Sequence, residues 1–255
     1  LHTFLSFSSV SDRSIPAMQQ LANETLHQQS FDVVIASTGM MATYALQAPA
    51  SSFTILEEHN SLTRWMRERY VAETHPVQKV RCWLSWQKTR RCEARLFSRF
   101  DLVTMVSQQD QAICRSDLPG YRGRVEVVPN GVDCTHNCPG LASPQPNHLV
   151  FNGSLTYSAN YDAIRWFLAE AYPLIKARQS AVSLTITGAL DGVDLSGLAL
   201  DASVQLTGFV EDVRLPVAEA TVAVAPIRQG GGTRLKILEA MALGAPVVAT
   251  TKGAE

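Results

Sequence analysis

Short runs of consecutive apolar residues recur along the chain, each four to seven residues long and rich in β-branched side chains. Runs without polar alternation are typical of strands that are buried on both faces, as in parallel sheets. We therefore predict nine strands, at residues 31–37, 53–57, 102–107, 125–128, 148–153, 183–188, 204–207, 221–226 and 246–250.

Apolar residues at helical spacing lie between many of these strands. They predict helices at residues 15–29, 76–99, 160–178 and 233–243. Alternating strands and helices form parallel βαβ units with helices on both faces of the sheet. The sequence therefore predicts an α/β protein.

The stretch from Pro129 to Pro146 breaks this alternation. It contains four prolines and two glycines and has no hydrophobic periodicity, which is typical of a linker between domains. We predict an N-terminal domain at residues 1–138 and a C-terminal domain at residues 147–255. Because ligands bind at the carboxyl ends of parallel strands, two such domains would hold a ligand in the cleft across which they face each other.

Composition limits the class of protein. The chain has 255 residues, a net charge of −1, 46% hydrophobic and 18% charged residues, which is ordinary for a globular protein and gives no support for nucleic-acid binding. No apolar run reaches the roughly 18 residues that span a bilayer, and no secretory signal is visible. Because the sequence starts at Leu1 and stops inside a strand-to-helix connection, we expect a piece of a longer chain.

Five cysteines, an odd number at irregular spacing, indicate free thiols and a cytoplasmic location. Cys134, His136 and Cys138 lie close in sequence, but they lack the second pair of ligands that a structural zinc site requires. No metal site is predicted.

A basic segment extends from Arg64 to Arg99. It holds ten Lys or Arg residues, three Glu residues and three tryptophans. One interpretation is a peripheral contact with the inner face of the membrane, with Trp at the level of the lipid headgroups and cations on anionic lipid. The other is a solvated helix whose Trp side chains pack inward. The segment is interrupted at Thr74–Pro76, so it is not one continuous amphipathic helix.

Glycines and cations meet in the stretch "QGGGTRLKILEAMALGAPVVATTKG", residues 229–253. A strand is followed by Gly230, Gly231 and Gly232 and then by a helix expected to start near Thr233. Glycines let backbone N–H groups approach a ligand, and a helix N-terminus binds anions. Three cations surround the loop, namely Arg228, Arg234 and Lys236.

Cations near a helix N-terminus are unfavourable unless an anion is bound there, so the pattern predicts a site for a diphosphate. At i, i+4 and i+7, Gly232, Lys236 and Glu239 share one helix face, and a carboxylate beyond the phosphates suits ribose hydroxyls. A glycine turn followed by an ordinary helix is the alternative. The stretch is neither a P-loop nor G-x-G-x-x-G.

The whole stretch P-I-R-Q-G-G-G-T-R-L-K-I-L-E-A-M-A-L-G-A-P-V-V-A-T-T-K-G-A-E resembles the donor site of family 4 glycosyltransferases, which have the GT-B fold of two Rossmann-like domains. Other segments match in the expected order. They are Val128–Asp133, similar to the interdomain hinge; Gly153-Ser154, which opens the second domain; and Gly208–Asp212, similar to the loop beside the nucleotide base.

The resemblance implies a transferase that moves a sugar from a nucleoside diphosphate donor to a saccharide or lipid-linked acceptor, usually with retention and without a bound metal or other cofactor. Polysaccharide and cell-envelope biosynthesis are typical roles. The implied donor-binding residues are Gly153, Phe209, Val210, Arg228, Gly230, Gly231, Gly232, Thr233, Arg234, Lys236 and Glu239.

Two departures from the family pattern concern the donor. Glu239 matches the second glutamate of the E-x7-E motif, which contacts the ribose, but Gly231 stands where the first glutamate is usual. The segment from Gly153 to Ala163 lacks the Arg and Lys that bind the diphosphate in many members. We therefore assign the phosphate charge to Arg234 and Lys236.

In the first domain, the strand ending at Glu57 and Glu58 leads into His59. The resemblance implies that His59 lies near the reacting carbon and contacts the sugar or supports the departing and arriving oxygens. The alternative is a capping or hydrogen-bonded structural histidine, because Asn60 or Ser61 also begins a helix well.

Two other functions remain as alternatives: a nucleotide-sugar epimerase of the same fold, and a non-catalytic nucleotide-sugar binding module, which the two departures favour. The sequence does not identify the donor base, the sugar or the acceptor.

Overall fold

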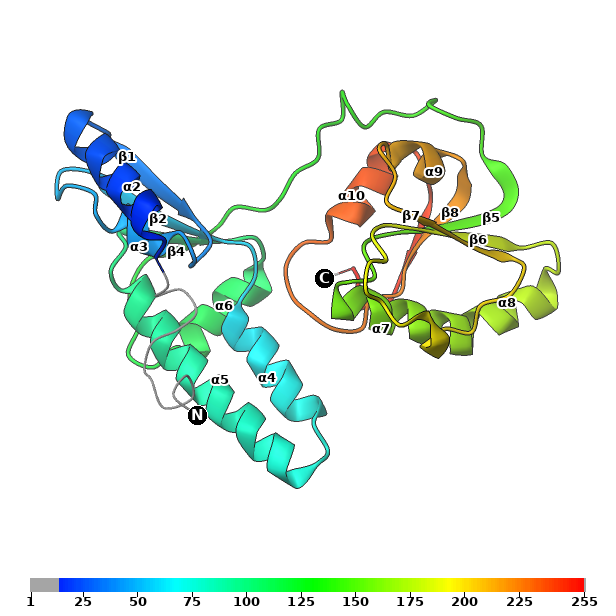
Figure 1. Ribbon diagram of the computed structural model, residues 1–255, viewed down its shortest axis with the longest axis horizontal. Helices are drawn as coiled ribbons and strands as arrows, with labels where there is room; N and C mark the ends of the chain where they lie inside the picture. Colours follow the sequence, from blue (N-terminus) through cyan, green and yellow to red (C-terminus); the bar gives the residue numbers. More distant parts are fainter. Residues whose placement is uncertain (1–13, 255) are drawn as a thin grey trace. The chain divides into compact units, whose positions relative to one another are not determined.

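In the computed structural model, which describes residues 14–254, the chain forms two compact units, each with its own parallel sheet (Figure 1). The first unit runs to Pro129 and includes Gly231–Thr233; the second comprises Asn130–Gly230 and the residues from Arg234 onward. All nine predicted strands are present, which confirms the α/β class.

The first unit contains four parallel strands in the order β1-β2-β3-β4. The strands are β1 (Val33–Ser37), β2 (Phe53–Glu58), β3 (Leu102–Met105) and β4 (Val125–Val127). The helices of this unit in the described residues are α2 (Pro16–Gln28), α3 (Ala42–Ala45), α4 (Leu62–Ala72), α5 (Pro76–Phe97) and α6 (Gln108–Asp117).

The core of the first unit lies between the sheet and the helices α5 and α6. Phe97 of α5 and Cys114 of α6 pack on Leu56, Val103 and Met105 of the central strands, and all five side chains are almost completely buried. These strands carry apolar residues at consecutive positions, so both the pattern and the burial match the sequence prediction for this part of the sheet.

Three helices of this unit, α3, α4 and α6, were not predicted. The reason for α4 and α6 is that polar side chains occupy their buried positions. Thr63 and Arg64 are the buried residues of α4, and Asp110 is buried in α6 beside Cys114. Without an apolar stripe, a helix gives no hydrophobic periodicity to detect.

The second unit contains five parallel strands in the order β7-β6-β5-β8-β9. The strands are β5 (Gln145–Asn152), β6 (Ser183–Thr187), β7 (Val204–Gly208), β8 (Ala220–Ala225) and β9 (Val247–Ala249). From β5 the chain first builds β6 and β7 on one side and then crosses to build β8 and β9 on the other. The strand order therefore reverses between β5 and β8, which is the switch point where doubly wound sheets bind ligands.

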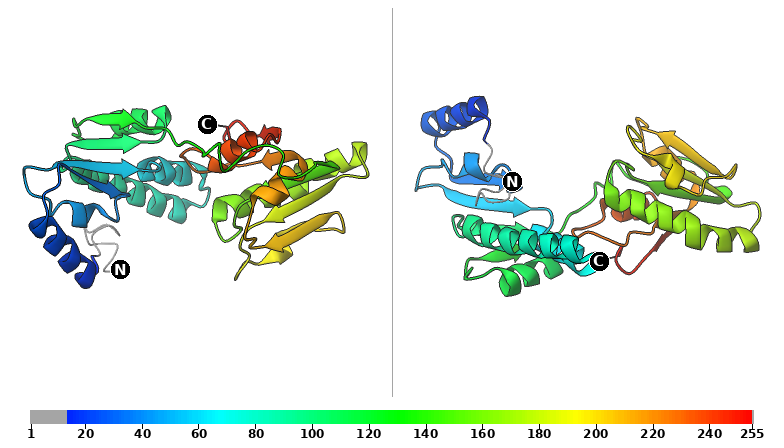
Figure 2. Two further views of the ribbon diagram at one scale, coloured as in Figure 1. Left: turned by 90° about the horizontal axis from the view of Figure 1, so that it is seen from above. Right: turned by 60° about the horizontal axis from the view of Figure 1, so that its bottom comes forward.

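Both faces of this sheet are covered, as the sequence predicts. Leu149 and Phe151 of β5 point to one face, where Ile164, Phe167 and other apolar residues of the long helical run pack on them (Figure 2). Val150 points to the other face and joins the cluster that contains Ala240 of α10.

The helical segments of the second unit are α7 (Ser158–Trp166), a π-helical stretch η2 (Phe167–Ala171), α8 (Tyr172–Arg178), a 3-10 turn η3 (Leu195–Gly197), α9 (Arg214–Ala218) and α10 (Leu235–Ala242). The single helix predicted at residues 160–178 is thus interrupted by η2. Pro173 follows directly in the first turn of α8. Because proline lacks an N–H and its ring clashes with the preceding turn, the wider π-helical turn accommodates it.

The predicted linker contains no helix or strand from residue 128 to residue 144. Its last two residues belong to β5, whose first residue Gln145 donates its N–H to the carbonyl of Glu219 at 2.8 Å. Pro146 fits this strand because the register of β5 against β8 shifts between Gln145 and Leu149, where a missing ladder donor is tolerated.

Two glycines bring the ends of β5 and β6 into close contact. Gly153 has a φ of 154° and Gly188 a φ of 125°, and Gly153 donates its N–H to the carbonyl of Thr187 at 2.9 Å. A Cβ on Gly188 would lie 2.5 Å from the carbonyl carbon of Gly153 and 2.6 Å from the nitrogen of Ser154. Only glycine allows this approach of two backbones.

We expect Gly188→Ala to lower the free energy of unfolding by about 3 kcal/mol, because the new methyl group displaces backbone and the positive φ is strained. Gly192→Ala is the matched control. Gly192 also has a positive φ, 71°, but a Cβ there meets nothing within 4 Å, so its cost is limited to about 1 kcal/mol of backbone strain. Urea denaturation measures both. If both variants lost the same free energy of unfolding, the close approach of the two backbones at Gly188 would not be what requires glycine there.

Candidate functional site

The loops after β5 and β8 meet at the switch point of the second sheet. The first begins with Gly153 and leads into α7, and the second runs from Pro226 to Arg234 and leads into α10. Both loops leave the carboxyl ends of neighbouring parallel strands. The side chains that they carry are therefore placed where such sheets bind ligands.

Lys236 of α10 reaches across to the turn after β5. Its Nζ donates to Oδ1 of Asn160 at 3.1 Å and lies 4.1 Å from the centroid of the Phe151 ring. Asn160 in turn donates to the carbonyl of Ser154 at 2.9 Å. A Cβ on Gly153 would lie 2.6 Å from the same Nζ. Gly153 therefore leaves the space that the ammonium group occupies.

The surroundings of Lys236 weaken its proton affinity. Burial, followed by the nearby positive charge of Arg234, lowers the pKa of Lys236 to about 8, while Glu239 opposes the shift. A partly desolvated ammonium with a second cation nearby and a lowered pKa is stabilised by an anionic ligand. The phosphate-binding role of Lys236 remains a prediction, and this environment is compatible with it.

Arg234 also bonds within the glycine loop. It is the N-cap residue of α10, which starts at Leu235, close to the predicted start near Thr233. Its Nη2 donates to the carbonyls of Gln229 at 3.2 Å and Gly230 at 2.7 Å. The guanidinium therefore closes the glycine loop on itself.

The prediction that Gly232, Lys236 and Glu239 share one helix face is wrong in one respect. Gly232 precedes the N-cap and has a φ of 78°, so it belongs to the loop. Gly231, Gly232 and Thr233 group with the first compact unit. Lys236 and Glu239 remain in α10, at a spacing of i, i+3 that places both on one side of the helix.

The remaining predicted donor residues lie at the edges of this site. Arg228 is turned toward α7, where its guanidinium is 3.9 Å from Oδ2 of Asp162 and stacks over Trp166. Phe209 and Val210 follow β7, and the Phe209 side chain is 79% exposed. Phe209 is therefore accessible to a planar ligand, whereas Arg228 fixes α7.

In the first unit, His59 follows β2 directly. Its Nε2 lies 3.1 Å from Oγ of Ser37, the last residue of β1, and 3.8 Å from Oε2 of Glu57. About half of its side chain is exposed. Ser61, not His59, caps α4, because its Oγ accepts from the N–H of Arg64 at 3.1 Å. The helix cap that was the structural alternative is thus supplied by Ser61.

Two buried carboxyl groups and one partly buried carboxyl group lie close to this strand end. They belong to Glu58 at the end of β2, Glu93 of α5 and Asp110 of α6. Glu93 accepts from both the N–H and the hydroxyl of Thr63, and Asp110 accepts from Oγ of Ser107 at 2.8 Å. These carboxyl groups and their hydrogen-bond partners therefore connect four elements of the unit, namely β2, α4, α5 and α6.

Arg64 brings a positive charge to these groups. Its Nη1 is 3.5 Å from Oδ1 of Asp110, and its Nε donates to Glu68 at 3.2 Å. Burial, with the charge of Glu93, raises the pKa of Glu58 to about 8, and burial raises the pKa of Glu93 to about 7. At neutral pH the cluster therefore retains protons.

Sequence reasoning missed Asn160, Glu93 and Asp110. Asn160 was part of the segment whose lack of cations we noted, and its amide was not considered as a partner for Lys236. Glu93 and Asp110 are ordinary charged residues of helices in the sequence. Their burial depends on contacts between residues about 30 positions apart, such as Thr63 with Glu93, which no local pattern encodes.

Within residues 14–254, no group of three or more His, Cys, Asp or Glu side chains is arranged to hold a metal ion. The five cysteines, including Cys134 and Cys138, are free thiols. None of the helices in this part of the chain combines the length and apolar character that crossing a bilayer requires.

Comparison with protein-family models decides the family. A model described as Glycosyltransferase Family 4 matches residues 3–136, more than half of the chain, and a model described as Glycosyl transferases group 1 matches residues 146–255. The chain belongs to glycosyltransferase family 4. The resemblance read from the donor-site stretch is thereby confirmed.

Solved structures show that this family 4 chain has the GT-B fold. TarM is 14% identical to this chain with a TM-score of 0.68, and the matched region covers 91% of this chain and 44% of TarM. Sucrose-phosphate synthase from Thermosynechococcus elongatus is 17% identical with a TM-score of 0.70, with coverages of 93% and 60%. HepE from Anabaena, solved with UDP and glucose, is 19% identical with a TM-score of 0.63, with coverages of 97% and 66%.

The family 4 chain thus spans between 44% and 66% of the length of these three structures. A comparison with curated protein sequences finds no match.

The carboxyl cluster makes the stability of the first unit depend on pH. Because the pKa values of Glu58 and Glu93 are raised from 4.5 to about 8 and about 7, the folded state binds more protons than the unfolded state between pH 4.5 and about 8. The stability that these two groups contribute is therefore fully present below pH 4.5 and is lost as the pH rises through about 7 and about 8. We expect Glu93→Gln, which keeps an acceptor for Thr63, to reduce this fall by up to about 1.4 kcal/mol per pH unit.

Urea denaturation at a series of pH values from 5 to 8.5 measures the effect. Glu126→Gln is the control, since Glu126 is a half-exposed carboxylate of β4 in the same unit, paired with Arg124 at 3.1 Å. Its curve should run parallel to that of the wild type. If the Glu93→Gln curve also runs parallel, the cluster does not carry the proton linkage.

Proposed function

We propose that the protein transfers a sugar from a nucleoside diphosphate donor to an acceptor, with retention of the anomeric configuration and without a metal or other cofactor. The observation that carries this proposal is the Lys236 ammonium beside Gly153, at the switch point of the second sheet. Family 4 membership supports the class of reaction.

The proposed role of Lys236 is to bind the diphosphate and to stabilise it as it departs. Negative charge develops on the leaving phosphate when the glycosidic bond breaks. A cation that is already positioned by Asn160 and partly removed from water stabilises this charge without reorganisation. Glu239, one turn further along α10, is proposed to accept from the donor ribose, and Phe209 and Val210 to lie beside the base.

For the first unit we propose that His59 contacts the transferred sugar or supports the oxygens that leave and arrive at its anomeric carbon. Its exposed ring and its contact with Ser37 keep Nε2 at the carboxyl ends of β1 and β2. This is the edge of a parallel sheet where ligands bind.

The acceptor is proposed to be a glycan or a lipid-linked saccharide of polysaccharide or cell-envelope biosynthesis. Free thiols at all five cysteines support a cytoplasmic location. The basic segment from Arg64 to Arg99 supports a peripheral contact with the inner face of the membrane.

Lys236→Ala should weaken the binding of a nucleoside diphosphate about tenfold or more, because it removes a charge-assisted contact from a partly desolvated site. Titration calorimetry with UDP, GDP and ADP measures the affinity, with UDP first because HepE was solved with UDP. For the wild type, affinity should fall as the pH rises above about 8, where Lys236 loses its proton, and Lys236→Ala should lack this fall. Arg178→Ala, an exposed cation at the end of α8, is the control.

Arg234→Ala should also weaken binding, since the loop then loses the guanidinium that joins the carbonyls of Gln229 and Gly230. Unchanged affinity in both Lys236→Ala and Arg234→Ala would refute the assignment of the phosphate site.

His59→Ala should lower the rate of donor turnover by about 100-fold while leaving nucleotide affinity unchanged, because the side chain belongs to the first unit and acts on the reacting sugar. Release of the nucleoside diphosphate with a mixed pool of saccharide acceptors reports turnover. Ser37→Ala, which removes only the partner of Nε2, should cause a smaller loss. Near wild-type turnover in His59→Ala would eliminate the proposed role.

A further inference from the structure

The outward face of α5 carries no acidic side chain. Positions spaced three or four residues apart along the helix define this face, and they are occupied by Val77, Val80, Arg81, Leu84, Lys88, Arg91 and Arg95. The two glutamates nearest in sequence lie elsewhere: Glu73 precedes the helix, and Glu93 is buried in the carboxyl cluster. Over five turns, the face is mainly apolar in its first half, where Arg81 is its one cation, and cationic in its second.

The apolar half of this face is open to solvent. Val77 is 64% exposed, Val80 59% and Leu84 39%, and Trp83 on the adjoining side is 43% exposed. The tryptophan next along, Trp86, instead stacks on Tyr70 with ring centroids 5.8 Å apart. Trp83 is thus available at the surface beside the valines, where its ring can insert between lipid headgroups.

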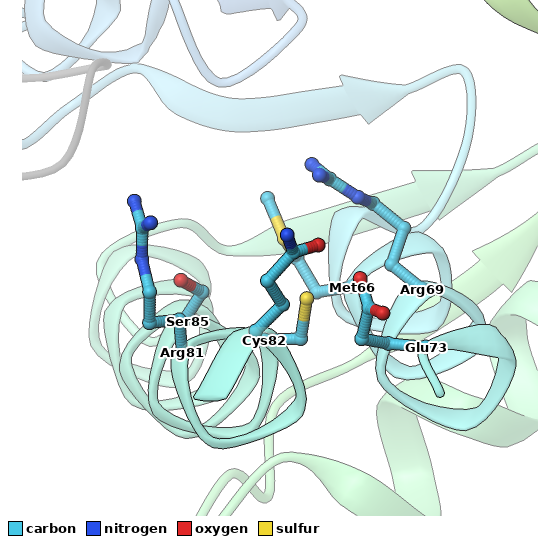
Figure 3. Close-up of a pocket in the computed structure, with 7 residues that line it drawn as sticks. Met66, Arg69, Glu73, Arg81, Cys82 and Ser85 are labelled. Atoms are coloured by element: carbon cyan, nitrogen blue, oxygen red, sulfur yellow. The ribbon is translucent and has the colours of Figure 1, made fainter. Parts of the chain in front are cut away.

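A cavity of about 510 Å³ lies between α4 and α5, which pack side by side (Figures 1 and 3). Its lining comes from Met66, Arg69 and Glu73 at the α4 side and from Gln78, Arg81, Cys82 and Ser85 of α5. Arg69 and Arg81 stand on opposite sides of the cavity, with the side chains of Met66 and Cys82 between them (Figure 3). Two guanidinium groups therefore flank one small hollow.

The charges around this hollow do not cancel. Arg69 stacks over Trp65 at 5.2 Å and makes no ion pair within 4 Å in the part of the chain that the structure describes. The carboxylate of Glu73 accepts from the N–H groups of Thr74 and His75 at 3.0 and 2.9 Å, so it caps the turn between α4 and α5. A phosphate between the two arginines would be matched by two planar groups of donors.

The positive charge is concentrated in this segment and is not a property of the whole chain. The segment from Arg64 to Arg99 has ten Lys or Arg residues against three Glu, in a chain with a net charge of −1. A purely electrostatic partner such as nucleic acid would have no use for the exposed apolar half of α5. A phospholipid surface matches both halves, since it offers anionic phosphates and an apolar layer directly beneath them.

We propose that α5 docks the protein on an anionic phospholipid surface, with the phosphate of one lipid headgroup held between Arg69 and Arg81. This docking gives the proposed membrane contact a defined surface and a headgroup site. It concerns only the first unit and requires neither a donor nucleotide nor sugar transfer.

Flotation with vesicles of phosphatidylcholine containing 30% phosphatidylglycerol tests the docking, with pure phosphatidylcholine vesicles as the reference. The wild-type chain, without nucleotide, should float with the anionic vesicles and remain unbound with the neutral ones. Arg81→Gln should lower the partition coefficient roughly fivefold, the loss expected for one cation near an anionic surface. Arg178→Gln, an exposed cation of α8 in the second unit, should bind like the wild type.

The apolar contact is tested in the same assay. Leu84→Ser should reduce binding several-fold, whereas Leu174→Ser, which changes a 69% exposed leucine of α8, should not. Equal flotation with both kinds of vesicle, or equal losses in each pair of variant and control, would overturn the docking surface. Because the assay contains no nucleotide, such a failure leaves the proposed sugar transfer standing.

The headgroup site predicts a difference between two arginines of α5. Arg81 borders the cavity and Arg91 lies on the same face of α5 outside it, so Arg81→Gln should cost more binding than Arg91→Gln. Equal losses in the two would overturn the headgroup site. Binding of a 20-base-pair DNA duplex at least as tight as that of anionic vesicles, and weakened by the same substitution, would instead assign the face to nucleic acid.

Discussion

The second unit depends on accommodating one ammonium group at the carboxyl edge of its sheet. Lys236 lies on the ring of Phe151, whose side chain belongs to the apolar core, and within residues 14–254 Asn160 is its one hydrogen-bond acceptor. Removing a cation from water costs free energy unless an anion or a hydrogen-bond network compensates. Gly153 supplies the space and Asn160 a single acceptor, so a bound anion would offset the rest of this cost.

The first unit meets the opposite problem. Its loops after β1 and β2 rest on Glu58, Glu93 and Asp110, with Arg64 at one side. Protons held by Glu58 and Glu93 reduce the repulsion. Thr63 donates to Glu93 and Ser107 to Oδ2 of Asp110, whereas the buried Oδ1 of Asp110 accepts no hydrogen bond in the described residues and faces Arg64 at 3.5 Å. Partly satisfied buried networks are costly, whereas fully bonded ones specify a single arrangement. The side chain of His59 is itself placed by polar contacts, with Ser37 at 3.1 Å and Glu57 at 3.8 Å.

This contrast explains what could be predicted from the sequence. Strands such as β5 and β6 are buried on both faces, so their apolar runs identify them directly, and the glycine stretch was correctly placed between a strand and a helix. Helix α4 buries Thr63 and Arg64, and α6 buries Asp110, so their inward faces resemble solvent-exposed surface in the sequence. The partner of Lys236, Asn160, lies 76 residues away, and only the crossing of the chain from β5 to β8 brings the two together.

The hydrogen bonds of Arg234 restrict which groups of the glycine loop can bind a phosphate together. Its guanidinium bonds the carbonyls of Gln229 and Gly230. In a trans peptide the N–H of the next residue points opposite to the carbonyl, so the N–H groups of Gly230 and Gly231 are directed away from this guanidinium. Arg234 at its observed position and these two N–H groups therefore cannot approach one phosphate from the same side. We infer that Arg234 shapes the loop in which Gly231 replaces the usual glutamate, and that Lys236 is left as the main cation for the diphosphate.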